Sequence, residues 1–146
     1  MDRALDERLM RRAIELARVA LGTTGDNPAV GCVIARGDVV LAEGATAPGG
    51  RPHAEEQALS LVGQAARGAT AYVTLEPCAE RSSGALSCSQ LLIAAGVARV
   101  VIAAGDPSPK AAGRGDQRLR GAGITVETGF LADEADPLYA EYRRRF

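Results

Sequence analysis

Four side chains of this 146-residue chain have the types and the order expected of a catalytic zinc site. The single histidine, His53, is followed two residues later by Glu55, and two cysteines, Cys78 and Cys88, come further along the chain. Imidazole nitrogen and thiolate sulfur are common zinc ligands, and three protein ligands leave the fourth tetrahedral position for water. We therefore expect His53, Cys78 and Cys88 to bind one Zn²⁺ per chain in a catalytic rather than a structural site.

Glu55 is the expected proton carrier beside this metal. Zinc lowers the pKa of a bound water from about 15.7 toward 7, so that hydroxide is available at neutral pH. A carboxylate that does not bind the metal can take the proton of that water and pass it to the substrate. With Glu55 in this role, the four side chains indicate hydrolytic deamination, in which an amine leaves as ammonia.

The spacing of His53 and Glu55 requires a helix that begins at this point. Two residues apart in a regular helix, the side chains would point about 200° from each other. They converge only where the helix starts, and Pro52 favours that place because proline suits the first turn.

The two cysteines are also expected at the ends of elements. Cys88 follows Ser87, a good N-cap, and a thiolate is favoured at a helix N-terminus by the free N–H groups and the helix dipole. Cys78 comes shortly after a strand that should end at Leu75. In open α/β sheets, ligands bind beyond the carboxyl ends of the parallel strands, so both thiols should face one site.

Hydrophobic periodicity predicts helices that alternate with strands. Helices are expected at about 5–21, 53–62, 88–95, 116–120 and 133–144, and strands at 29–35, 39–43, 71–75, 100–104 and 124–127. The first two strands, joined by 36–38, should form an antiparallel hairpin, whereas the apolar strand 100–104 is typical of a buried parallel strand. The order predicts an α/β fold, a three-layer α/β/α sandwich with a five-stranded mixed sheet, as one domain spanning 1–146.

Composition and charge argue against several classes of protein. Hydrophobic residues make up 47% of the chain and charged residues 24%, as in an ordinary globular domain. The formal net charge of −1 argues against a nucleic-acid partner, because such binding rests on Lys and Arg that neutralise phosphates. No apolar run approaches the ~18 residues of a membrane span, and the amino terminus lacks an apolar signal region. We expect a cytoplasmic protein with no membrane partner, whose cysteines stay reduced.

The third cysteine, Cys32, allows an alternative reading of the metal site. It lies in an apolar run and is expected to be a small buried thiol of the core. If Cys32 were instead a fourth zinc ligand, the site would be closed, and the chain would be a non-catalytic, structural zinc protein.

The His53-Ala54-Glu55 and Pro77-Cys78 elements resemble the cytidine-deaminase-like superfamily of zinc deaminases. Their flanks are similar to the deaminase half of the bifunctional riboflavin-biosynthesis deaminase/reductase. The matching stretches are 27–31, 50–55, 72–78, 106–107 and 112–115. The similarity covers nearly the whole chain and stops near Phe146, so we expect a free-standing deaminase domain without the reductase domain.

The resemblance implies a cytidine-deaminase-like fold and hydrolysis of an exocyclic amine on a small aminopyrimidine or related heterocycle. The first substrate to consider is the diaminopyrimidine ribosylamine phosphate of riboflavin biosynthesis. The resemblance also implies a homo-oligomer, either a homodimer or a homotetramer. It places Asn27, Ala54 and Asp106 at the substrate, although Asn27 and Asp106, each next to a proline, can equally be turn residues.

Three loops depart from the family pattern. Thr46 stands where the family tends to have His, and Ser108 stands where it usually has Asn or Asp. The segment 79–87 lacks the family's His and its Gly-Lys/Arg-Thr-Pro-Pro run, which helps to hold the phosphorylated ribose arm. Arg81 can restore a phosphate contact, or it can be an exposed loop arginine.

All three departures fall on loops expected to face the substrate, while the zinc residues are intact. This pattern favours retained chemistry with altered specificity. The alternative to the riboflavin intermediate is therefore a paralogous deaminase that acts on a different free base, nucleoside or aminated heterocycle.

Overall fold

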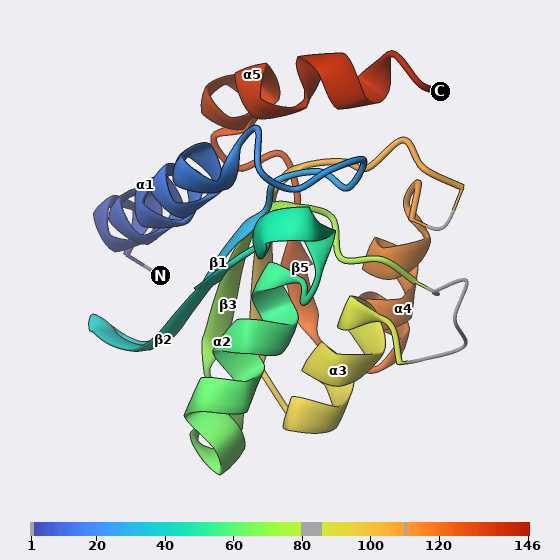
Figure 1. Ribbon diagram of the computed structural model, residues 1–146. Helices are drawn as coiled ribbons and strands as arrows, with labels where there is room; N and C mark the ends of the chain where they lie inside the picture. Colours follow the sequence, from blue (N-terminus) through green and yellow to red (C-terminus); the bar gives the residue numbers. More distant parts are fainter. Residues whose placement is uncertain (1, 80–85, 110) are drawn as a thin grey trace.

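The computed structural model describes residues 2–79, 86–109 and 111–146. Its centre is one sheet with the strand order β2-β1-β3-β4-β5 (Figure 1). The strands are β1 (Gly31–Arg36), β2 (Val39–Ala45), β3 (Thr70–Leu75), β4 (Arg99–Ala104) and β5 (Thr125–Glu127). β1 pairs antiparallel with both β2 and β3, whereas β4 pairs parallel with β3 and β5. The predicted mixed sheet and its hairpin are confirmed.

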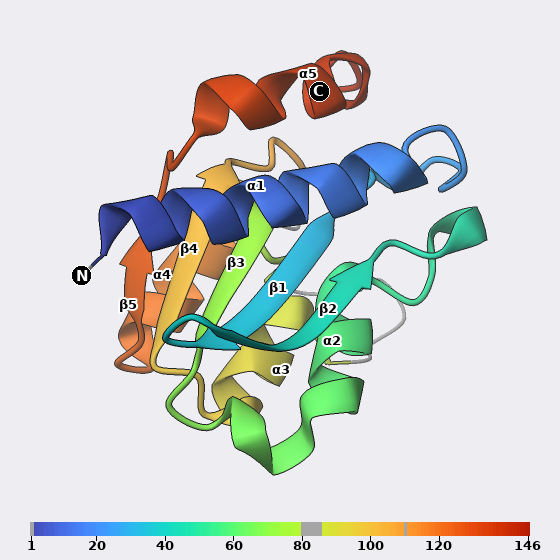
Figure 2. The same ribbon diagram turned by 90° about the vertical axis from the view of Figure 1, so that its left-hand side faces the viewer.

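Helices cover both faces of this sheet. α1 (Arg3–Ala20) and α5 (Ala132–Arg143) lie on one face, and α2 (Ala54–Val62), α3 (Cys88–Ala95) and α4 (Arg114–Gly121) lie on the other (Figures 1 and 2). Two short 3₁₀ turns, Pro48–Gly50 and Gly63–Ala66, flank α2. The three-layer α/β/α sandwich predicted from the sequence is confirmed.

Four predicted boundaries differ from the structure by two residues: the starts of α1, β1 and α4 and the end of β2. The first strand begins at Gly31 rather than at 29, and the Val30 N–H before it donates to the Thr46 hydroxyl oxygen at 2.9 Å instead of to a backbone carbonyl. The fourth helix begins at Arg114 rather than at 116, after Gly113 with a φ of 87°. The N–H groups of Gly113 and Asp116 at this end of the helix donate to the Glu76 carboxylate.

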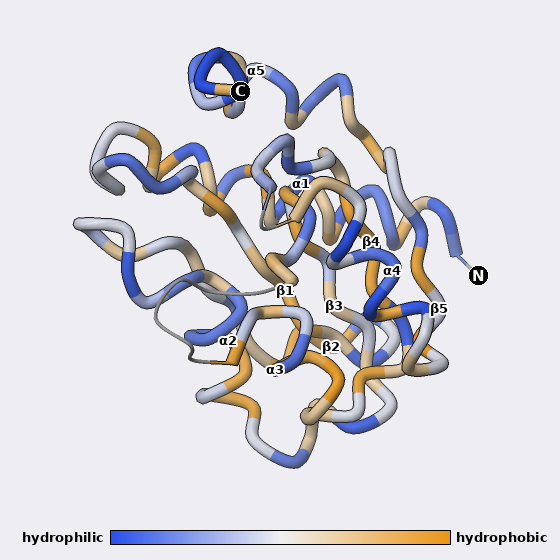
Figure 3. The backbone as a smooth tube through the Cα atoms, turned by 90° about the vertical axis from the view of Figure 1, so that its right-hand side faces the viewer, coloured by the Kyte–Doolittle hydropathy of each residue, from blue (hydrophilic) through white to orange (hydrophobic). Residues whose placement is uncertain are grey.

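The core lies between the sheet and the helices on its two faces. The apolar β1, β3 and β4 run through the middle of the molecule (Figure 3). α1 lies so close to β1 that a Cβ added to Gly31 would sit 1.9 Å from the Ala13 carbonyl oxygen, so only glycine fits there. None of the helices among the described residues is both long and apolar enough to cross a membrane.

A buried polar cluster joins α1 to the sheet at the end where β3 and β4 begin. The Asp6 carboxylate, 2% exposed, accepts hydrogen bonds from the Tyr72 hydroxyl at 2.7 Å and from Arg99 Nη1 and Nη2 at 2.9 and 2.7 Å. These hydrogen bonds, first of all the one from Arg99, lower the pKa of Asp6. The burial of Tyr72 and its hydrogen bond to Asp6 raise the pKa of Tyr72 to about 12. The cluster fixes the sheet end opposite the site.

Candidate active site

A cavity of about 150 Å³ lies at the carboxyl ends of β3 and β4. Leu75, the last residue of β3, lines it, as does Asp106, two residues beyond the end of β4. His53, Glu55, Cys78 and Cys88 line it as well. The four residues proposed for zinc chemistry therefore share one cavity, at the sheet edge where an α/β fold binds its ligands.

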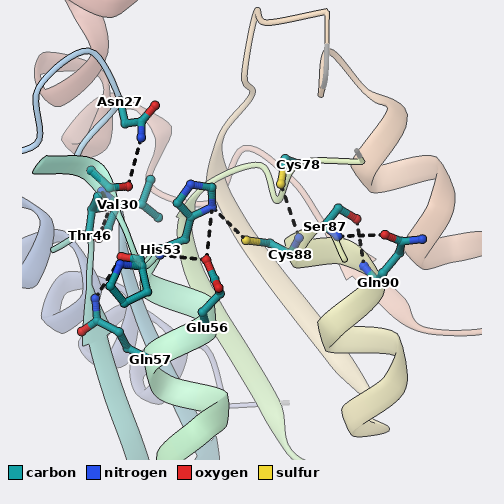
Figure 4. A network of polar contacts seen from close by, with 12 residues as sticks. Asn27, Val30, Thr46, His53, Glu56, Gln57, Cys78, Ser87, Cys88 and Gln90 are labelled. Carbon is teal, nitrogen blue, oxygen red and sulfur yellow. Dashed lines mark hydrogen bonds and ion pairs between the residues drawn. The ribbon is translucent and has the colours of Figure 1, made fainter. Parts of the chain in front are cut away.

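The three predicted zinc ligands converge from three segments of the chain (Figure 4). One ligand atom from each of His53, Cys78 and Cys88 lies within 4.8 Å of the others. His53 Nδ1 is 3.3 Å from Cys88 Sγ. Tetrahedral zinc with ordinary Zn–S and Zn–N bonds separates its ligand atoms by about 3.5–3.8 Å. The donor set fits Zn²⁺, and its spacing reaches the tetrahedral one after shifts of at most about 1 Å.

His53 lies at the helix start that its spacing with Glu55 requires. It is the N-cap of α2, with φ −72° and ψ 161°, and its backbone N–H donates to Glu56 Oε1 at 3.0 Å. Its ring points toward Cys88 (Figure 4). Glu55, in the first turn of α2, lines the same cavity. The side chain of Glu55 is buried, with 3% of the residue exposed.

The two cysteines also occupy the predicted ends of elements. Cys88 is the first residue of α3, and Ser87 caps that helix by accepting from the Gln90 N–H at 3.2 Å. Cys78 follows β3, and its Sγ accepts from the Cys88 N–H at 3.3 Å. The helix N-terminus therefore donates directly to the second sulfur, which is the setting that stabilises a thiolate.

Burial and hydrogen bonding shift two ionisable groups in opposite directions. Hydrogen bonds, first from Cys88 and then from His53, lower the pKa of Cys78 to about 4, although its burial acts the other way. Burial raises the pKa of Glu55 to about 7, against the hydrogen bond from its own backbone N–H. Cys78 is therefore disposed to be a thiolate ligand, and Glu55 has a proton affinity near neutrality.

Cys32 is separate from this group. It lies on β1, has no exposed surface and belongs to the apolar core, and burial raises the pKa of its thiol. The prediction of a core thiol is confirmed. The ligand set among the described residues therefore has three members, which leaves one zinc coordination position open to a non-protein ligand.

Four of the residues predicted to contact substrate line the cavity: Asn27, Thr46, Asp106 and Ser108. The Thr46 hydroxyl accepts from the Val30 N–H and also lies 3.3 Å from the Pro28 carbonyl oxygen, so it holds the loop before β1.

The remaining predicted contacts have different positions. The Asn27 amide donates to the Gly50 carbonyl at 3.0 Å, which gives this residue a structural role in addition to its place in the cavity wall. Ala54 has no exposed surface and packs behind the wall, against Gly44. Arg81 lies outside the described residues.

Three polar or charged residues that line the cavity were not predicted from the sequence: Arg51, Glu76 and Tyr142. Glu76 lies two residues before Cys78 in the sequence, but its hydrogen-bond partners lie 37 and 40 residues further along the chain. Its carboxylate accepts from the N–H groups of Gly113 at 3.0 Å and Asp116 at 3.2 Å, and so caps α4. Tyr142 belongs to α5, where helical periodicity would assign its ring to the core.

The α/β/α sandwich with a histidine, two cysteines and a buried glutamate in one cavity has the architecture of a zinc-dependent deaminase. The family model described as the cytidine and deoxycytidylate deaminase zinc-binding region matches residues 3–104. The chain belongs to this family.

Similar proteins and structures come from the same group. The riboflavin biosynthesis protein RibD of Escherichia coli is 48% identical over 140 residues, which cover 96% of this chain and 38% of RibD. The diaminohydroxyphosphoribosylamino-pyrimidine deaminase of Buchnera aphidicola is 45% identical over 86% of this chain and 85% of its own length. A solved structure of Acinetobacter baumannii RibD superposes with a TM-score of 0.92 at 44% identity, over 99% of this chain and 40% of that one. The chain thus spans about two fifths of the RibD proteins and most of the Buchnera deaminase.

Proposed function

We propose that this chain is a zinc-dependent hydrolase that replaces an exocyclic amine of a pyrimidine-like ring with oxygen and releases ammonia. The observation that carries the proposal is the meeting of His53, Cys78 and Cys88 in one cavity with the buried carboxylate of Glu55. Membership of the cytidine and deoxycytidylate deaminase family supports it.

The side chains of the cavity divide the reaction between them. His53, Cys78 and Cys88 hold the metal, which when bound supplies the Lewis acidity that makes water nucleophilic at neutral pH. Glu55 takes a proton from the water that attacks the ring carbon and delivers it to the adjacent ring nitrogen. Glu55 then passes the second proton of that water to the leaving amine. The ring carbon gains a C–O bond and loses its C–N bond, and the amine departs as ammonia.

The proposed substrate is the diaminopyrimidine ribosylamine phosphate of the riboflavin pathway. The Buchnera deaminase bears the name of this activity, and its similarity extends over most of both chains. In the proposal, Asn27, Asp106 and Ser108 contact the substrate from the cavity wall. Ala54, Thr46 and Arg81 remain predicted contacts.

A second candidate is a deaminase of the same chemistry that acts on a different base, nucleoside or aminated heterocycle. The observation that favours it is that Thr46 and Ser108, two departures from the family pattern, both line the cavity. The hydroxyl of Thr46 is occupied by backbone groups of the loop before β1, so it presents less to a ligand than an imidazole would.

An ammonia-release assay on zinc-loaded protein separates these candidates. The panel holds the ribosylaminopyrimidine phosphate, its dephosphorylated form, cytosine, cytidine, deoxycytidylate and an aminopurine. The proposal predicts the fastest turnover with the phosphorylated ribosylaminopyrimidine and its loss on chelation of the metal. Turnover of unphosphorylated compounds alone would overturn the substrate assignment, and no turnover of any compound would overturn the deaminase.

We further propose one deaminase domain over 1–146 that assembles as a homodimer or homotetramer in the cytoplasm. The coverage of the Buchnera deaminase supports the single domain. The described cysteines form no disulfide, which agrees with a reducing compartment. Light scattering coupled to size exclusion measures the assembly, and a monomer at micromolar concentration would contradict it.

A further inference from the structure

Tyr142 brings the C-terminal helix α5 into the wall of the cavity. Its hydroxyl donates to Asp106 Oδ1 at 2.9 Å, and both residues line the cavity. The backbone N–H of Ser108 donates to the same oxygen, also at 2.9 Å. Asp106 itself is buried, with 9% of its surface exposed. One carboxylate oxygen at the edge of the cavity is therefore held by two donors from different segments of the chain.

The other oxygen of Asp106 has a different environment. Within the described part of the chain, Oδ2 makes no hydrogen bond, although the side chain lies in the cavity wall. Among the described residues, Arg99 Nε is the one fully buried side-chain nitrogen or oxygen atom without a partner, so Asp106 Oδ2 is accessible and open to a donor in the cavity. The two donors on Oδ1 therefore leave Oδ2 as the acceptor available to a molecule in the cavity.

The position of Tyr142 is itself well fixed. One turn earlier on α5, the fully buried Tyr139 donates to the Ala29 carbonyl at 2.8 Å, and its hydroxyl is 2.6 Å from the Thr74 hydroxyl. Residues three apart share a helix face, so the anchor at Tyr139 directs Tyr142 toward the same end of the sheet. The Tyr142 ring also packs edge-on against Phe146, with 5.4 Å between centroids.

We propose that Tyr142 is a positioning residue for substrate binding, which orients Asp106 so that its Oδ2 accepts a hydrogen bond from a hydroxyl or N–H group of the substrate. The inference rests on the proposed deaminase function. A phenol suits this task because it donates to the carboxylate without adding a charge to the cavity. An unheld carboxylate has to lose rotational freedom on binding, and preorganisation removes that loss.

The test is Tyr142→Phe, which removes one oxygen and keeps the ring. With the best substrate of the ammonia-release panel, KM should rise about tenfold, equivalent to about 1.4 kcal/mol, while kcat stays within about threefold. Asp106→Asn should raise KM as well. Because both changes disturb one interaction, the double variant should bind no worse than Asp106→Asn alone.

Tyr72→Phe is the matched control, since it removes a tyrosine hydroxyl that donates to a buried aspartate, Asp6, at 2.7 Å at the opposite end of the sheet. It should lower thermal stability and leave KM unchanged. An unchanged KM in Tyr142→Phe, or additive effects in the double variant, would overturn the positioning role while wild-type turnover upholds the deaminase. An inactive wild type would overturn the proposed function and this inference with it.

Discussion

Replacing Glu76 by glutamine should loosen the loop that forms one wall of the cavity. The Glu76 residue is 6% exposed, and its carboxylate accepts from Gly113 N–H through Oε1 and from Asp116 N–H through Oε2. Asp106 N–H lies 3.5 Å from Oε1. This one side chain therefore joins the end of β3 to both ends of the 106–116 segment, which carries two of the predicted substrate contacts.

The loss of stability in Glu76→Gln can be worked out from the two backbone N–H groups that donate to the carboxylate. In either amide orientation, glutamine turns an NH₂ toward a backbone N–H and loses at least one charge-assisted hydrogen bond, a loss of about 1.5–3 kcal/mol. The remaining bond becomes neutral and weaker. We expect the free energy of unfolding to fall by about 2–4 kcal/mol, and the melting temperature by about 3 °C for each kcal/mol.

Urea titration of the zinc-loaded variant measures this change, with Glu141→Gln on the exposed side of α5 as the matched control. The variant should keep one zinc per chain, because no ligand is altered, and its KM should rise because the loop is less ordered. A stability within about 0.5 kcal/mol of wild type would refute the reasoning.

Two further substitutions test the frame that supports the site. Asp6→Asn should lower stability by about 3 kcal/mol at pH 7, because the 12%-exposed Arg99 side chain loses its closer carboxylate partner and keeps only Glu127, at 3.4 Å. The folded state lowers the pKa of Asp6, so the contribution of Asp6 is complete above the ordinary value of 3.8 and is lost as the pH falls through the lowered one. Urea titrations of wild type and variant should therefore begin to converge only below pH 3.8 and meet below the lowered pKa. Gly44→Ala should cost about 1–3 kcal/mol and weaken zinc binding in a competition assay, because its Cβ would sit 2.3 Å from the carbonyl oxygen of Ala54 in the first turn of α2. Equal zinc affinity in that variant would contradict the coupling between β2 and the metal site.

Much of the fold follows from short-range sequence signals. The capping serine Ser87 and the terminating Gly96 fix α3 at 88–95, as predicted, and Gly96 adopts a φ of 76° as a helix C-cap. The zinc group could be predicted for a similar reason, because the spacing of His53 and Glu55 is compatible with one site only at a helix start.

The wall of the cavity could not be predicted in the same way. Glu76 finds its partners 37 and 40 residues further along the chain, and Tyr142 reaches Asp106 across 36 residues. Neither contact has a local sequence signal, because each depends on how two loops and α5 pack around the end of the sheet. The extended start of α4 has the same origin, since the Glu76 carboxylate supplies a cap that the helix sequence lacks.

The central claim is that Glu55 is the proton carrier of a zinc-dependent deamination, and Glu55→Gln tests it most directly. Zinc content by atomic absorption and ammonia release should be measured on the same sample, with Glu141→Gln as the control. We predict one zinc per chain in both variants and a kcat lower by about 10²–10⁴-fold in Glu55→Gln alone. A Glu55→Gln variant that holds its zinc and turns over at the wild-type rate would contradict the account.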